Sequence, residues 1–217
     1  MESPADLDRV LGLRDVVVVE GPDAQTYLHS QLSQDLNGIE VGDSRWTFVL
    51  EPTGKVEILA RVTRVGDECY ELDTDEGFGD ALLARIDRFK IRVAADTSLA
   101  DPRGEPADEA GRVALGWPRM GSEITPGETI PAGTGVTSLA VSFTKGCYPG
   151  QELVERMDSR SADAPRSLRR LVVDQGAVPG DPVIDDGDEV GVITSVAGDR
   201  AIGWVKRSSD VGEFVEF

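Results

Sequence analysis

The first part of the chain begins with a short β-branched run that leads into an amphipathic stretch. The run Asp15–Glu20 is followed by a Gly-Pro turn, after which Asp23 opens a segment where Tyr27, Leu32 and Leu36 recur at helical spacing. A continuous apolar run of this length is typical of a buried strand, and apolar residues three to four positions apart are typical of one helix face. The pattern predicts a strand, a turn and a helix.

Two further runs are joined by a strong turn sequence. Arg45–Leu50 and Val56–Val65 flank the turn Glu-Pro-Thr-Gly, which predicts a hairpin, and Cys69–Asp73 continues it. Phe78–Phe89 has one apolar helical face, and Ile91–Ala94 is predicted to return as a strand. The order βαβββαβ indicates an α+β fold, an α/β sandwich in which helices cover one sheet.

The rest of the chain is divided by two irregular segments. Ala100–Gly111 has no apolar periodicity and predicts a mobile linker at about 100–112, and Ser159–Pro165 is a second break. Short runs separated by Gly, Asp and Pro turns then predict five strands and a small antiparallel β-barrel. These runs are Leu168–Val173, Pro182–Ile184, Glu189–Val196, Ala201–Val205 and Glu213–Phe217. We therefore expect one domain over residues 1–160 and a C-terminal β-barrel domain over 161–217.

Composition narrows the possible functions. The 217 residues carry a formal charge of −18, which disfavours nucleic acid and anionic membranes as direct partners. One histidine and two distant cysteines, Cys69 and Cys147, argue against a disulfide framework and a multi-histidine metal site, so no stably bound metal is predicted. The chain shows neither a signal-peptide pattern nor a long apolar run, and a cytoplasmic location is expected.

One segment combines several features that favour a reactive thiol. Cys147 lies between Gly146 and Gly150, directly before a predicted helix at Gln151–Met157 and two residues after Lys145. A helix N-terminus and a nearby cation both favour the thiolate, which is the nucleophilic form of cysteine. The alternative is a small, inert cysteine buried in a packed turn.

Charge is distributed unevenly around this cysteine. The stretch Lys145–Arg170 holds six basic and four acidic side chains, so it is the part of this acidic chain best suited to attract a small anion. Arg156 and Arg160 are four residues apart, which places both guanidinium groups on one helical face for a carboxylate or phosphate. Alternatively, they pair with Glu152 and Glu155 on a solvated face.

The segment Lys145–Glu152, KGCYPGQE, resembles the K-G-C-[FY]-x-G-Q-E signature of the YgfZ family. These are folate-binding proteins of iron–sulfur cluster maintenance, related to the T-protein of the glycine cleavage system. The resemblance implies a T-protein-like α/β sandwich followed by a small barrel. It extends from about Val17 to Arg207, through Val17–Leu36, Gly116–Ile124, Val190–Ser195 and Ala201–Arg207.

The chain departs from the family and its relatives at two places. Ile58 and Leu59 stand where aminomethyltransferases carry an acidic pair, and Glu57 points to the opposite face of the strand. A classical aminomethyltransferase activity is therefore not expected. The family's P-x-E also reads Pro-Ala-Gly, with Gly133 in place of the carboxylate. The possible substitutes are Glu123, Glu128 and Glu152.

The resemblance implies tetrahydrofolate as cofactor, which requires a carboxylate for the pterin, apolar walls and cations for the glutamate tail. Glu152 is expected to accept from the pterin, and Tyr148 and Trp117 to line the rings. Arg119, Arg156 or Arg160 would meet the tail. Core packing is the alternative for both aromatic residues. The full set assigned to cofactor binding is Trp117, Arg119, Tyr148, Gln151, Glu152, Arg156 and Arg160.

The function that the resemblance implies is that of a folate-dependent accessory protein for assembly or repair of iron–sulfur clusters. Cys147 would be its reactive centre, with Lys145 shaping the field. Its partners would be folate and iron–sulfur client or assembly proteins, with tRNA modification affected only indirectly through client enzymes. Any cluster at Cys147 would need further ligands from a partner or glutathione. The alternatives are a tetrahydrofolate-dependent one-carbon transferase and a non-catalytic folate- or anion-binding module.

Overall fold

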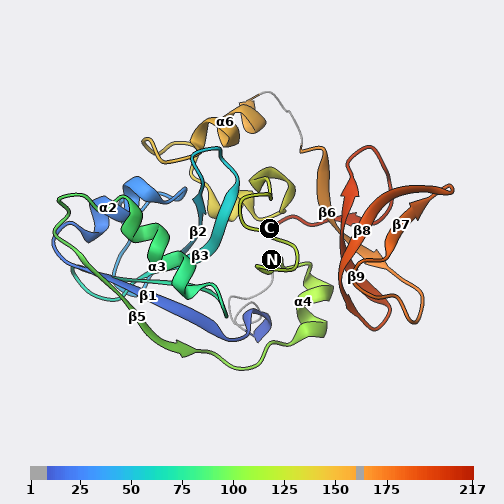
Figure 1. Cartoon of the computed structure of the whole chain (residues 1–217), viewed down its shortest axis with the longest axis horizontal. Helices are drawn as coiled ribbons and strands as arrows, with labels where there is room; N and C mark the ends of the chain where they lie inside the picture. The colour runs from blue at the N-terminus through green and yellow to red at the C-terminus, as the bar shows by residue number, and fades with distance from the viewer. Residues whose placement is uncertain (1–8, 160–163) are drawn as a thin grey trace.

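The computed structural model describes residues 9–159 and 164–217 (Figure 1). Its first half is built on a five-stranded antiparallel sheet with the order β2-β3-β4-β1-β5. The strands are β1 (Arg14–Glu20), β2 (Ser44–Leu50), β3 (Val56–Arg64), β4 (Cys69–Asp75) and β5 (Asp96–Arg103). The β-branched run of β1 lies between two neighbouring strands, which explains why Val16, Val17 and Val19 are buried.

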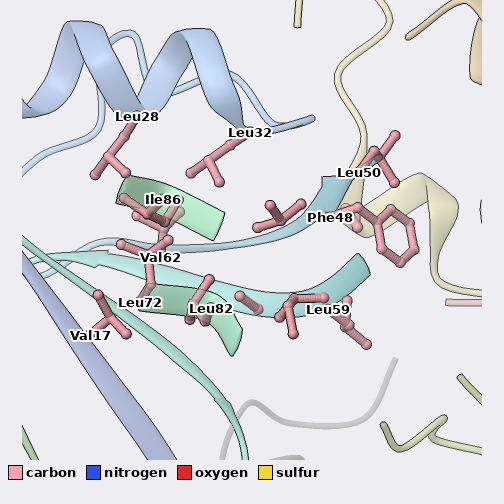
Figure 2. Close-up of a cluster of buried hydrophobic side chains, with 14 of the residues drawn as sticks. Val17, Leu28, Leu32, Phe48, Leu50, Leu59, Val62, Leu72, Leu82 and Ile86 are labelled. Atoms are coloured by element: carbon pink, nitrogen blue, oxygen red, sulfur yellow. The ribbon is translucent and has the colours of Figure 1, made fainter. Parts of the chain in front are cut away.

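Two helices contribute to the core of this sheet. The helices α2 (Ala24–Gln31) and α3 (Gly79–Arg88) bury their apolar residues against the strands. Figure 2 shows Leu28 of α2 and Ile86 of α3 beside Val62 and Leu72 of the sheet. The predicted α+β order, with helices packed on an antiparallel sheet, is confirmed in this region.

The helix α2 is shorter than its apolar spacing predicts. It ends at Gln31, and Leu32 is already extended and forms a backbone bridge to Val49. Leu36 remains fully buried although it lies outside the helix. The apolar spacing thus identified the buried positions correctly. The last of them, Leu36, lies in an irregular segment and not in the helix.

The strand predicted at Ile91–Ala94 is wrong, and the segment predicted as a linker at about 100–112 is irregular only over 104–108. The fifth strand is β5, which pairs with β1, and it is followed by the helix α4 (Glu109–Leu115). The side chains of β5 are half-buried or exposed, so its sequence lacks an apolar period while its backbone still pairs. Pro102 fits this position because an edge strand tolerates a missing N–H donor.

The second half contains another five-stranded antiparallel sheet, ordered β10-β6-β9-β8-β7. Its strands are β6 (Arg166–Val172), β7 (Pro182–Asp185), β8 (Asp188–Ala197), β9 (Arg200–Lys206) and β10 (Glu213–Phe214). The five predicted strands are confirmed, with the last one shorter. Among the described residues no strand pairing joins β7 to β10, and closure into a barrel stays a prediction.

Along the chain, short helical elements separate the strands of the first sheet from those of the second, and an apolar cluster is shared by the two halves. These elements are η1 (Pro131–Gly133), α5 (Thr137–Ala140) and α6 (Gln151–Ser159). Val113 of α4 packs with Leu168, Ile202 and Val215, which joins the first half to the second sheet. The predicted domain boundary at 160/161 falls in the segment outside the described residues.

Candidate functional site

The loop that carries Cys147 rests on the turn of the β2–β3 hairpin. Gly54 in the turn and Gly150 in the loop both have positive φ, +86° and +82°. A Cβ added at Gly150 would lie 2.4 Å from the Glu51 carbonyl oxygen, and one added at Gly54 would lie 2.4 Å from Cβ of Leu153. Glycine is therefore required on both sides, because the two backbones touch. The hairpin thus fixes the start of α6, which lies above it in Figure 1.

Cys147 is exposed on this loop, four residues before α6 begins at Gln151. Gln151 Nε2 lies 3.9 Å from Cys147 Sγ, and Gln151 Oε1 accepts a hydrogen bond of 2.9 Å from the Tyr148 backbone N–H. Gln151 therefore connects the thiol to the turn. The alternative of a buried, inert cysteine does not describe Cys147.

Lys145 contacts the backbone at the end of α2 and just after it. Its ammonium donates to the backbone carbonyls of His29, Leu32 and Gln34, and it lies 5.1 Å from the Tyr148 ring centroid. Burial lowers the pKa of Lys145 to about 8. These contacts tie the segment after α2 to the loop, and the expected role of Lys145 in shaping the field at Cys147 stays a prediction.

The two predicted aromatic walls are both buried. Trp117 is 2% exposed and packs against Trp46 and Phe217, with ring centroids 4.6 Å and 5.0 Å away. Tyr148 is 8% exposed, and burial raises the pKa of its phenol to about 12. In this conformation both rings pack as core residues, which is the alternative that the sequence left open.

Arg119 lines a different place, a cavity of about 330 Å³ beside the end of β4. Leu11, Leu13 and Met120 supply apolar walls, and the carboxyl group of Asp75 supplies an acidic group. Arg119 is partly exposed and forms an ion pair of 2.9 Å with Glu109. This cavity combines a carboxyl group, a cation and apolar walls.

Asp75 is the buried carboxyl group of this cavity, and the sequence interpretation missed it. It pairs with Arg14 and accepts a hydrogen bond of 2.8 Å from the Met120 backbone N–H. Burial raises its pKa, although Arg14 acts in the opposite direction. The available signal was Asp73 and Asp75 inside a strand, where two unpaired acids are unfavourable.

The three glutamates considered as substitutes for the absent P-x-E carboxylate lie in different environments. Glu123 is buried and binds Arg112 at 2.9 Å, Ser195 at 2.6 Å and Thr194 at 2.7 Å. These contacts make it a structural link to β8. Glu128 and Glu152 are exposed.

On α6, the described arginine of the predicted anion-binding face, Arg156, is open to solvent. Arg156 is exposed, and no ion pair of the described residues joins it to Glu152 or Glu155. Arg160 lies outside the described residues. Arg156 thus remains available to an anion on the same helix that begins next to Cys147.

The positions of the absent acidic pair are part of the core. Ile58 is 0% exposed and Leu59 2%, so neither offers a proton-transfer group. Glu57 instead binds Arg85 of α3 at 2.9 Å and lies 3.5 Å from Arg88. This side chain neutralises a buried guanidinium group.

Two separate chemical sites result: the exposed thiol at the start of α6, and the cavity at Asp75 and Arg119. None of the described residues that line this cavity belongs to the loop at 143–150. In the described part of the chain, no three His, Cys, Asp or Glu side chains gather into a metal-binding group. No helix there is long and apolar enough to cross a membrane.

Comparison with solved structures shows which fold this is. The glycine cleavage system aminomethyltransferase T of Bartonella henselae superposes with a TM-score of 0.77 over 93% of this chain and 80% of that one. The chain has the aminomethyltransferase T fold. At 16% sequence identity, this similarity describes the fold alone.

The sequence relatives include proteins with two different named functions, and no family model matches the chain. An iron–sulfur cluster assembly factor IBA57 homolog of Neurospora crassa is 23% identical over 80% of this chain and 55% of its own length. An aminomethyltransferase of Streptomyces avermitilis is 26% identical over 87% of this chain and 49% of its own length. An uncharacterized Haemophilus influenzae protein is 24% identical over 68% of this chain and 67% of its own. The chain thus spans about half the length of the two relatives with named functions.

Proposed function

We propose that this protein is a folate-binding accessory factor for assembly or repair of iron–sulfur clusters, with the Cys147 thiol as its reactive group. The observation that carries the proposal is an exposed cysteine on a glycine-clamped loop, within an aminomethyltransferase T fold whose acidic pair is replaced by Ile58 and Leu59. The similarity to an iron–sulfur cluster assembly factor supports the same function. The resemblance of the loop to the YgfZ signature agrees with it.

The cavity at Asp75 is where we place the pterin of a reduced folate, which would supply one-carbon chemistry when bound. The Asp75 carboxyl group can accept from the donor-rich pterin edge, and Leu13 and Met120 can line the ring. Arg119 offers a cation for a carboxylate. These groups fit the cofactor in kind, and they include one of the predicted folate residues.

In this proposal an iron–sulfur cluster is cargo that the protein helps to transfer, and not its resident cofactor. Cys147 can provide one thiolate, whereas Cys69 lies on β4 in a different part of the fold. Further ligands would then come from a partner protein or glutathione, since clusters are held by several thiolates.

Complementation of a strain that lacks the gene tests the role of the thiol. Cys147→Ser should fail to restore the iron–sulfur enzyme activities that wild type restores, whereas Cys69→Ser should restore them. Both proteins must accumulate to the wild-type level, which is measured by immunoblot. Full restoration by Cys147→Ser would remove Cys147 from the proposal.

Calorimetry with tetrahydrofolate under anaerobic conditions tests the cofactor site. Arg119→Ala and Asp75→Asn should weaken binding by about tenfold or more, because each removes a charged hydrogen-bond partner. Glu152→Ala and Arg156→Ala, on the exposed face of α6, serve as the comparison. If only the α6 variants weaken binding, the folate lies at the helix and not in the cavity.

A one-carbon transferase is the second candidate, favoured by the similarity to the Streptomyces avermitilis aminomethyltransferase. Formation of methylenetetrahydrofolate from an aminomethyl donor tests it directly. Robust turnover by the wild-type protein would rank this activity first.

A further inference from the structure

The second sheet has a solvent-open apolar groove that neither the thiol nor the folate cavity uses. The β6–β7 groove, of about 540 Å³, is lined by Leu171, Val183 and Ile193, which belong to the core of the second sheet. At its edge Val172 is 87% exposed and Ile184 54% exposed. Large exposed apolar side chains around a groove are characteristic of a binding surface.

The groove has a single sign of charge. Its only charged lining residues among those described are Asp174 and Asp181. They belong to the segment 171–199, which contains seven acidic residues and not one lysine or arginine. The strand β7 is also the free edge of its sheet, so the groove is not closed by a further described strand on that side.

We infer that the β6–β7 groove binds a partner protein through a basic segment with an apolar anchor. The anchor side chains would cover Val172 and Ile184, and flanking lysines or arginines would lie against Asp174 and Asp181. This occupant satisfies both the apolar lining and the acidic edge. It goes beyond the proposed function, because it involves neither Cys147 nor the Asp75 cavity.

Charge also argues against a second copy of this chain as the occupant. Two symmetric copies would bring two acidic edges together, and each molecule carries a formal charge of −18. Nucleic acid is disfavoured for the same reason.

Fluorescence anisotropy with three labelled nine-residue peptides tests the inference. The probe has Leu-Val-Leu at its centre and three lysines on each side. The first control replaces all lysines by glutamate, and the second replaces the centre by Ser-Gly-Ser. We expect the probe to bind the full chain and both controls to bind at least about tenfold more weakly.

Variants then locate the binding. Val172→Asn and Ile184→Asn should each weaken binding of the probe about tenfold, whereas Ile91→Asn should not, although Ile91 is 77% exposed in the first half. The pair Asp174→Asn and Asp181→Asn should weaken binding and flatten its salt dependence, while Asp67→Asn should not. Circular dichroism verifies that every variant is folded.

Three outcomes would overturn the inference. If the Ser-Gly-Ser peptide bound as tightly as the probe, binding would depend on charge alone. If Ile91→Asn weakened binding of the probe as much as Val172→Asn and Ile184→Asn do, the peptide would not bind in the groove. Sedimentation that shows a wild-type dimer and an Ile184→Asn monomer would make a second copy the occupant.

Discussion

Among single residues, the two cysteines differ in accessibility, and the environment of Cys69 disfavours its thiolate. Cys147 is exposed, whereas Cys69 is half-buried on β4. Burial raises the pKa of the Cys69 thiol, and the nearby carboxylates Glu20 and Glu71 raise it further. Cys69 therefore holds less thiolate than an ordinary cysteine at pH 8, and thiolate is the form that reacts.

We predict that iodoacetamide at pH 8 alkylates Cys147 well before Cys69. Mass spectrometry of tryptic peptides measures the two rates separately. Cys147→Ser should lose the fast phase and Cys69→Ser should keep it. Because the pKa of Cys69 is raised, its rate should continue to increase with pH above the ordinary thiol range. Equal rates at pH 8 would contradict the environment described for Cys69.

The residues of the site were predictable only as far as local sequence determines them. The exposed turn at Cys147 follows from nearby glycines and the helix start, which lie within a few positions. The contacts of Lys145 are made with carbonyls up to 116 positions away, and Asp75 depends on Arg14, 61 positions away. No local pattern encodes such pairs, so the sequence indicated neither the carbonyl contacts of Lys145 nor the buried carboxyl group of Asp75.

At the scale of elements, the contact between the β2–β3 turn and the Cys147 loop makes a specific prediction. Gly150→Ala and Gly54→Ala should each destabilise the fold by about 2 kcal/mol or more, since a Cβ there meets backbone or Leu153 at 2.4 Å and φ is positive. Gly146→Ala, in the same loop, should change stability by less than about 0.5 kcal/mol. A Cβ at Gly146 would meet nothing within 4 Å. Urea unfolding measures all three.

Element prediction from sequence succeeded where side chains are sorted by burial. β1, the β2–β3 hairpin, α3 and the strands β6, β8 and β9 of the second sheet all carry such a signal. β5 does not, because backbone hydrogen bonds to β1 hold it while its side chains are largely exposed. The strand β5 forms because its backbone pairs with β1, while its own sequence has the composition of a linker.

At the scale of the whole molecule, a buried ion pair joins the first half to the second sheet. Arg112 binds Glu123 at 2.9 Å and Ser195 of β8 at 2.6 Å, with both charged side chains at 1% exposure or less. Arg112→Met should lower the free energy of unfolding by about 3–5 kcal/mol, because it leaves Glu123 buried without its cation.

Urea unfolding checks this loss, with Arg88→Met as the control. Arg88 is 54% exposed, and its ion pair with Glu57 should contribute no more than about 1 kcal/mol. If Arg112→Met and Arg88→Met were equally stable, the pair would not hold the two halves together.

Alkaline titration is predicted to end in unfolding. Burial raises the pKa of all three tyrosines, Tyr27, Tyr70 and Tyr148. The phenols keep their protons in the folded state at pH values where the unfolded chain releases them, so their contribution to stability is lost as pH rises above about 10. Absorbance at 295 nm should rise together with the loss of far-ultraviolet circular dichroism. Phenol ionisation without unfolding, at the ordinary pKa, would contradict this.

The cluster of Trp46, Trp117 and Phe217 has an optical consequence. Trp46 belongs to the first sheet, and its ring centroid is 4.6 Å from that of Trp117, which also contacts Phe217 beyond β10. Two indoles this close couple electronically, and Arg14 and Arg61 lie over the Trp46 ring. The near-ultraviolet circular dichroism spectrum of the unlabelled protein therefore reports whether Trp117 is packed against Trp46 and Phe217. It can be recorded on the same sample that is used to assay the thiol or the ligand.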